Sequence, residues 1–292
     1  MIKAGELLTP IINLLNDQLL AGPLIHMDET PVQVLGEPDK PPQSKSYMWI
    51  RVGGTPEKQV RLFDYAPTRS GQVPVHLLQD YNGFLLTDGY EGYNAVVTKN
   101  NIKPLACWAH VRRKFDEALK AQKNKTGKAQ MALSLIQKLY AVEKAIRHLP
   151  PEEKQLQRQQ KTKPILNQIK IWMDKSIEQV LPKSLLGKAL HYMHKLWPKL
   201  IAYADSGYTE IDNNTAENAI RPFVLGRKNW IFSQSVRGAK SSAALYSVIE
   251  SSKANGLEPF KFLTLLFEKL PNVETMEGLE RLLPWHVVDD LS

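Results

Sequence analysis

Apolar residues recur along this chain with two spacings, one typical of short strands and one typical of amphipathic helices. Residues 2–20 have apolar positions three and four apart, which predicts a helix that ends at Gly22-Pro23. Short apolar or alternating runs follow, and each predicts a strand: 24–31, 46–52, 59–65, 84–88 and 103–107. Helical spacing returns between 115 and 204, and again at 237–254 and 259–270. This order predicts an α/β fold with flanking helices and a helical insertion.

These elements predict how the chain is divided. An N-terminal helix (1–22) precedes the first part of a sheet-containing core (23–115). A basic helical insertion (116–204) follows, and its Gln- and Lys-rich stretch 152–163 is predicted to be at most a mobile loop. The core is then completed by 205–255, and a helical tail occupies 256–292.

Two of the predicted strands end at an aspartate, Asp28 in the first and Asp88 in the fourth. Strand ends at one edge of an open α/β sheet are common ligand sites, although a single acid there is often only a turn former or a helix cap. Two such acids, together with Glu217 on a later predicted helix, indicate a site for a divalent cation. Mg²⁺ prefers carboxylate oxygens and keeps waters that phosphate oxygens can replace.

The segment 212–235 predicts a helix that carries this third acid. Asp212 or Asn213 can cap its start. Asn213, Glu217 and Arg221 fall four apart and therefore share one face, and Pro222 predicts that the helix ends or kinks there. A capped surface helix with an ion pair between Glu217 and Arg221 accounts for the same pattern equally well.

Basic and aromatic residues follow this helix at once. Arg227 and Lys228, together with Arg221 on the helix, are suited to bind DNA phosphates, and Trp230 is suited to stack on a base or sugar. The alternative for Trp230, which precedes Ile-Phe, is a place in the packed core.

Charge and composition indicate the kind of partner and the compartment that suit this protein. The net charge is +8, and residues 112–199 contain 20 Lys and Arg against 7 Asp and Glu, which favours an anionic partner such as nucleic acid. A solvated, lysine-rich helical face would give the same balance. The single cysteine, Cys107, excludes an internal disulfide and indicates a reducing compartment. No apolar run reaches the roughly 20 residues that span a bilayer, so we expect no membrane contact.

Four segments, in this order, carry a resemblance to a known family: HMDETPVQVL, LLTDGYEGYNAV, CWAHVRRKFDEA and the long block that starts DNNTAENAIRPFVLGRKNWIFSQS. They resemble the transposases of the insertion sequence 66 family. The resemblance implies a ribonuclease-H-like fold, interrupted by a helical insertion before the last catalytic helix. It also implies a catalytic and metal-binding triad of Asp28, Asp88 and Glu217, with Mg²⁺ as cofactor and Mn²⁺ able to replace it.

The activity that the resemblance implies is hydrolysis at the ends of the element, followed by attack of the new 3′-hydroxyl on target DNA. The expected partners are the double-stranded DNA of the ends and target, further copies of the chain on that DNA, and accessory proteins of the element. The expected location is the bacterial cytoplasm, at the nucleoid. Cys107 and His110 form a pair that recurs in several such families, where it supports the catalytic core; Arg112 and Arg113 beside it are candidates for contacts with the DNA backbone.

Full-length members of this family carry an N-terminal zinc-finger-like segment and a helix-turn-helix, neither of which is expected in this sequence. Two alternatives therefore stay open beside the transposase: a non-cleaving DNA-binding or regulatory fragment, and a ribonuclease-H-like nuclease or resolvase that uses the same metal chemistry.

Overall fold

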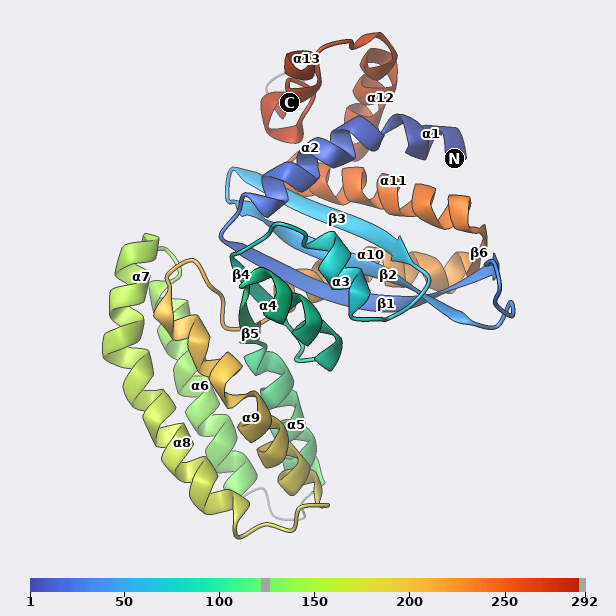
Figure 1. Cartoon of the computed structure of the whole chain (residues 1–292). Coiled ribbons are helices and arrows are strands. Elements are labelled where there is room, and N and C mark those ends of the chain that lie inside the picture. The colour runs from blue at the N-terminus through green and yellow to red at the C-terminus, as the bar shows by residue number, and fades with distance from the viewer. Residues whose placement is uncertain (122–126, 289–292) are drawn as a thin grey trace. The chain divides into compact units, whose positions relative to one another are not determined.

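The computed structural model describes residues 1–121 and 127–288 and divides them into two compact units. The sheet unit contains residues 1–85, 91–103 and the described residues from Asn214 onward. The helical unit contains 86–90 and the described residues of 104–213. The last residues of the predicted tail lie outside the described part. Each unit is taken by itself below (Figure 1).

One mixed sheet holds the six strands found among the described residues, in the order β3-β2-β1-β4-β5, with β6 paired to β1. The strands are β1 (Leu24–Gly36), β2 (Lys45–Thr55), β3 (Lys58–Ala66), β4 (Phe84–Thr87), β5 (Lys103–Ala106) and β6 (Phe232–Ser235). β2 is antiparallel to both β1 and β3, whereas β6 is parallel to β1. The predicted fold class is confirmed: an open mixed sheet with flanking helices, consistent with a ribonuclease-H-like fold.

Several helices accompany the sheet (Figure 1). They are α1 (Ile2–Leu7), α2 (Thr9–Leu20), α3 (Gln72–Leu77), α4 (Asn94–Asn100), α10 (Asn214–Trp230), α11 (Val236–Ala254), α12 (Pro259–Lys269) and α13 (Met276–Glu280). Short 3₁₀ turns lie at Glu91–Tyr93, Leu270–Asn272 and Pro284–His286. No helix within the described ranges is both long and apolar enough to cross a bilayer.

The core of the sheet unit lies between β1–β3 and two helices. Alternate residues of β1 and β2, such as Val32 and Ile50, pack with the buried face of α10, which contains Ala216 and Phe223. The start of α11 contributes Ala239 to the same cluster. Side chains two apart on a strand share a face, so this face of the sheet is the one that α10 and α11 cover.

Helix α11 also runs along β3 and satisfies backbone groups of that strand. Three polar side chains spaced four residues apart, two on α11 and one at its C-cap, each accept a hydrogen bond from the N–H of an alternate residue of β3. Ser251 and Asn255 also donate to the carbonyl of the same strand residue. The pairs are Ser247 with Phe63, Ser251 with Arg61, and Asn255 with Gln59. One helical turn and two strand residues advance by similar lengths, which allows the pairing to repeat.

The helical unit consists of α5 (Trp108–Lys120), α6 (Lys128–Ile146), α7 (Pro151–Gln157), a π-helical turn (Arg158–Thr162), α8 (Lys163–Ile177), α9 (Leu185–Ile201) and a 3₁₀ turn (Ala202–Asp205). The prediction of a loop at 152–163 is wrong, because Arg158 anchors this stretch. Its guanidinium is buried, pairs with Glu143, and donates to the carbonyl oxygens of Tyr203 and Thr209. The polar composition of the stretch gives no sign of this buried arginine.

Three further local predictions differ from the structure. The helix predicted for 2–20 breaks after Leu7, because Pro10 cannot bond to the carbonyl of Glu6, and the Thr9 hydroxyl donates to that oxygen instead at 2.8 Å. Strand β1 continues past Asp28 to Gly36. Of the two outcomes predicted at Pro222, an end or a kink of the helix, the end is wrong: α10 continues to Trp230, and Phe223 beyond the proline packs in the core.

Candidate active site

Asp28 lies in the middle of β1 and not at its end. It pairs across the sheet with Ile50 of β2, so its side chain is on the face that α10 covers. The carboxylate is partly buried, and its Oδ1 accepts a hydrogen bond from the backbone N–H of Glu29 at 2.8 Å. This bond holds the carboxylate against its own strand.

Glu29 projects from the opposite face of β1, as strand alternation predicts. Its side chain is 1% exposed and forms an ion pair with Arg69. The hydroxyl of Tyr93 donates to the other carboxylate oxygen at 2.5 Å, and the ring of Tyr93 meets that of Trp49 edge to face. Glu29 is therefore a buried anchor of the strand that carries Asp28. Arg69 and Tyr93 compensate the cost of burying its negative charge.

Glu217 lies in the first turn of α10. Its neighbours Ala216 and Ile220 are buried in the core cluster, whereas Glu217 itself is partly buried. Because α10 packs on the sheet face that holds Asp28, both acids lie on the same side of the sheet. An acid near a helix start is also favoured by the helix dipole.

Asp88 directly follows β4, as predicted, and belongs to the helical unit. Its Oδ1 accepts a hydrogen bond from the backbone N–H of Tyr90 at 2.8 Å, across a turn in which Gly89 has a φ of +90°. The hydroxyl of Tyr192 donates to the backbone oxygen of Asp88 at 2.5 Å. The turn and the tyrosine fix the backbone that presents this carboxylate.

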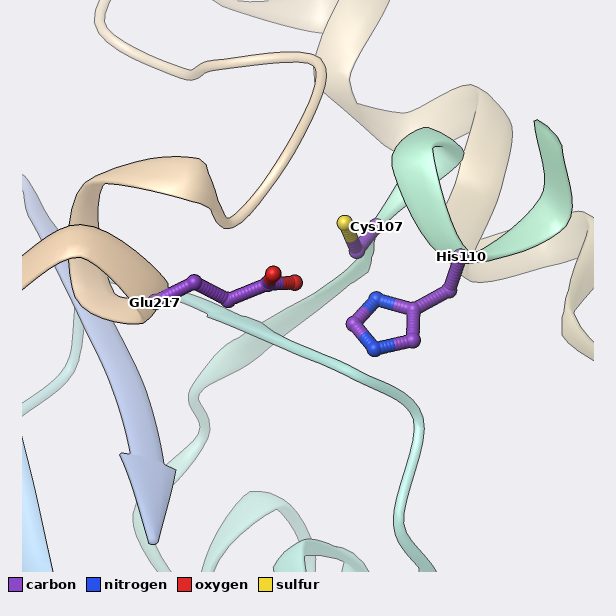
Figure 2. Close-up of side chains that lie close together, drawn as sticks. All are labelled: Cys107, His110 and Glu217. Carbon is purple, nitrogen blue, oxygen red and sulfur yellow. The ribbon is translucent and has the colours of Figure 1, made fainter. Parts of the chain in front are cut away.

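Cys107 and His110 stand at the start of α5 with ligand atoms within 4.8 Å of each other (Figure 2). The thiol is buried and accepts a hydrogen bond from the backbone N–H of Asn213 at 3.2 Å. Burial raises the pKa of the Cys107 thiol to about 12, even though this hydrogen bond lowers it. The bond from Asn213 gives Cys107 a partner within the helical unit, and its supporting role stays a prediction. Glu217, which Figure 2 also labels, belongs to the sheet unit.

The segment before α10 is tied to the helical unit by side chains. Asp212 accepts a hydrogen bond from the hydroxyl of Tyr140 at 2.8 Å, and Asn213 is fully buried. Burial and the nearby Asp212 carboxylate raise the pKa of Tyr140, which keeps its proton for this bond. Asp212 therefore has a partner within the helical unit, beside its predicted role as a helix cap.

The predicted DNA-contact residues differ in exposure. Arg112 and Arg113 are exposed on α5, and Arg221 and Lys228 are exposed on α10. All four positively charged groups are thus at the surface, where a phosphate could reach them. The guanidinium of Arg112 also lies 5.9 Å from the ring centroid of Tyr140.

Arg227 and Trp230 have partners inside the sheet unit. Arg227 donates to the hydroxyl of Thr30 at 2.9 Å and to the carbonyl of Pro31, which ties α10 to β1. Trp230 packs against the core and meets Phe223 edge to face, with ring centroids 5.4 Å apart. Trp230 is partly buried by this packing, which agrees with the packed alternative, and its stacking on a base stays a prediction.

Sequence patterns did not identify Arg69 and Tyr93 as partners of Glu29, since nothing in their local spacing connects them to β1. They also missed the exposed pair Ile231 and Phe232, although both follow directly after the basic residues that were selected.

The chemistry expected of Asp28, Asp88 and Glu217 fits Mg²⁺, because each offers carboxylate oxygens and none is fully buried.

Comparison with known proteins gives a consistent result. A family model described as the transposase IS66 family matches residues 1–241, and a model of the IS66 C-terminal element matches 247–285. The uncharacterized protein y4jD of Sinorhizobium fredii is 33% identical over 231 residues, covering 76% of this chain and 44% of the relative. The uncharacterized protein y4hP of the same organism is 28% identical over 299 residues, covering 97% and 54%. The chain spans about half the length of these curated relatives, and no solved structure matches it.

Proposed function

Because the chain belongs to the IS66 family of transposases, we propose that it is the catalytic part of a transposase whose acids are Asp28, Asp88 and Glu217. The main support is that two of the acids lie on the same side of the sheet: Asp28 is on the face that α10 covers, and α10 carries Glu217. Asp88 belongs to the helical unit, so the proposal requires the three carboxylates to be together in the active complex with DNA.

The proposed reaction has two displacements at phosphorus. Water first attacks a phosphodiester at the end of the element, which breaks the P–O bond and leaves a 3′-hydroxyl. That hydroxyl then attacks a phosphodiester of target DNA, joins to it, and releases a new 3′-hydroxyl on the target. In each step one P–O bond forms and another breaks at the same phosphorus, so neither step needs an oxidant or a reductant.

The carboxylates of the three acids would hold Mg²⁺, with Mn²⁺ as a substitute. Bound there, the ion would supply positive charge at the attacked phosphate and favour ionisation of the attacking group. Asp28 is suited to ligate because its Oδ1 is held by the N–H of Glu29, which limits its rotation. The buried anchor of Glu29 with Arg69 would keep this part of β1 in place during the reaction.

Cys107 and His110 are proposed to support the start of α5 and the segment that leads into α10. The N–H of Asn213 donates to the Cys107 sulfur, which links these two segments within the helical unit. Arg112, Arg113, Arg221 and Lys228 are proposed to bind DNA phosphates. The proposed partners are double-stranded DNA, further copies of the chain on it, and accessory proteins of the element, in the bacterial cytoplasm.

The test is strand cleavage and joining on a labelled duplex copied from the ends of the element that carries this gene, with Mg²⁺ or Mn²⁺. We expect products with the parent chain and none with Glu217→Gln. Glu268→Gln, which removes an exposed carboxylate from α12 of the same unit, is the matched control and should keep full activity. Equal activity of the parent and Glu217→Gln would refute the triad.

Two other results would support the alternatives. DNA binding without cleavage by the parent chain, under all metal conditions, would favour a non-cleaving binding fragment. Metal-dependent cleavage of branched DNA without any joining would favour a nuclease or resolvase.

A further inference from the structure

The turn between α10 and β6 exposes two adjacent large apolar side chains. Ile231 is 63% exposed and Phe232 is 41% exposed. They follow directly after Trp230, the residue predicted to stack on a base, which is partly buried against the core. The two residues after it are the more exposed ones. Exposed apolar residues that stand together on a surface mark contacts with another molecule more often than scattered ones do.

The backbone at this turn is strained. Ile231 has a φ of +66°, in the left-handed region that β-branched residues rarely adopt. Its N–H donates to the carbonyl of Arg227 at 2.8 Å, which places Ile231 just after the last turn of α10, where glycine is the usual residue. Strain of this kind persists only where the surrounding structure imposes it, and it is concentrated at functional sites.

The base of the turn is rigid. On one side Trp230 packs against Phe223, and on the other Phe232 pairs in register with Gln33 of β1. Arg227 bonds to Thr30 and so fixes the last turn of α10 to the same strand. The two exposed side chains are therefore presented by a supported turn rather than by a loose loop.

The charge around the turn is positive and suits one class of partner. Between Asn218 and Ile249 the sequence has no Asp or Glu and has five basic residues: Arg221, Arg227, Lys228, Arg237 and Lys240. Two of these have partners within the sheet unit, because Arg237 forms an ion pair with Glu6 and Arg227 donates to Thr30. Lys228 and Asn229, which immediately precede Trp230, are exposed. An apolar tip with a cationic surround suits DNA, in which phosphates flank stacked bases.

We infer that Ile231 and Phe232 form a wedge that enters the base stack of duplex DNA and holds an unstacked base. Phe232 offers a ring face for stacking, and Ile231 occupies the gap that the displaced base leaves. Lys228 neutralises a phosphate beside the opened step. The inference rests on the proposed function, because the DNA is the substrate of the proposed transposase. Opening a base step would bend or unpair this DNA near the attacked phosphodiester.

The experiment measures binding in EDTA, so that it does not depend on the acidic triad. Two probes are used: a fully paired duplex and the same duplex with one unpaired nucleotide beside 2-aminopurine. We expect the parent chain to bind the unpaired probe more tightly by roughly fivefold or more, the scale of one base stacking on an aromatic ring, and to raise the 2-aminopurine fluorescence of both probes.

Single substitutions test whether the two wedge side chains carry this preference. Phe232→Ser and Ile231→Gly should each reduce the preference toward one while binding the paired probe within about twofold of the parent. Ile231→Gly should also melt at the same or a higher temperature, because glycine accepts the left-handed backbone. Phe260→Ser removes a phenylalanine that is 76% exposed on α12 and should change neither quantity.

Several results would overturn the inference. These are no binding to either probe, equal binding of both probes by the parent, a preference that survives in both wedge variants, or a lower melting temperature of Ile231→Gly together with an unchanged preference. Loss of self-association in Phe232→Ser with the preference intact would instead assign the turn to contacts between copies. Asp28→Asn should keep the preference, so a failure of the triad and a failure of the wedge can be told apart.

Discussion

Arg158 and Glu143 form a buried ion pair in which Nη2 of the arginine lies 2.6 Å from Oε2 of the glutamate, with side chains 3% and 14% exposed. The same guanidinium donates to the carbonyl oxygens of Tyr203 and Thr209 at 3.2 and 3.0 Å. One side chain therefore joins α6, the π-helical turn and the segment after α9. That segment leads to Asn213 and from there into the helix of Glu217.

Replacing Arg158 should lower the free energy of unfolding of the helical unit. Arg158→Met removes the cation and leaves Glu143 partly buried without it, a change that typically costs about 3–5 kcal/mol. The loss is measured as a lower urea midpoint by far-ultraviolet circular dichroism. Arg147→Met, an exposed position at the end of α6, should stay within about 0.5 kcal/mol of the parent.

A second variant tests whether the ion pair itself is responsible. Changing Glu143 to Met in the Arg158→Met background should recover part of the stability, because no unpaired charge then remains buried. An Arg158→Met protein as stable as Arg147→Met would contradict the assignment of Arg158 as the anchor of this stretch.

Asp28→Asn should abolish metal-dependent cleavage and leave DNA binding largely intact. Amide nitrogen cannot replace the carboxylate as a ligand for a hard cation, whereas phosphate binding comes from Lys and Arg. Cleavage and retention on immobilised DNA are measured on the same preparations. Asp17→Asn, an exposed acid on α2, should cleave as well as the parent. Cleavage by Asp28→Asn at the parental rate would remove Asp28 from the catalytic set.

Lys228 and Arg227 are adjacent but should respond differently. Lys228→Gln should weaken DNA binding and lower the slope of log affinity against log salt by about 0.9, the value for one phosphate contact. Arg227→Gln should mainly destabilise the fold, by about 1–3 kcal/mol, because buried Thr30 loses its partner. Binding titrations between low and moderate salt, together with urea unfolding, give both quantities. The reverse outcome would exchange their roles.

Stability should fall at alkaline pH partly because of Cys107. Its pKa in the folded chain is about 12, raised by burial from an ordinary value of 9.0, so the folded state keeps a proton that the unfolded state releases. Its contribution is complete below about pH 9 and is lost as the pH rises toward 12, at about 1.4 kcal/mol per pH unit for one proton. Cys107→Ser should therefore have a shallower decline between about pH 9 and 10.5. Identical slopes would show that the thiol titrates normally.

Five of the six strands in the described part of the chain, and most helices, follow from local spacing, whereas β6 was not predicted. Local patterns failed where a distant partner decides the structure. Thr30, Val32 and Val34 extend β1 past Asp28 because β2 and β6 pair with it on both sides. Residues 152–163 are helical because Arg158 forms a buried ion pair with Glu143, and the polar composition of the stretch does not indicate this pair.

The candidate site shows the same limit. Position in family segments identified Asp28, Asp88 and Glu217, and their roles stay predictions. The choice of Trp230 for stacking relied on residue type alone, yet exposure decides which aromatic residue can meet a base. Trp230 packs on Phe223 while Phe232 reaches solvent, and only three-dimensional packing distinguishes them.

The hydrogen bonding of α11 to β3 has a consequence for how copies of this chain can assemble. Ser247, Ser251 and Asn255 occupy backbone groups that an outermost strand would otherwise offer to a strand of another molecule. Continuation of the sheet from one copy to the next is therefore blocked at β3. At this edge, copies of the chain would have to meet through helices or turns, and crowding of copies should not seed fibrils from this side of the sheet.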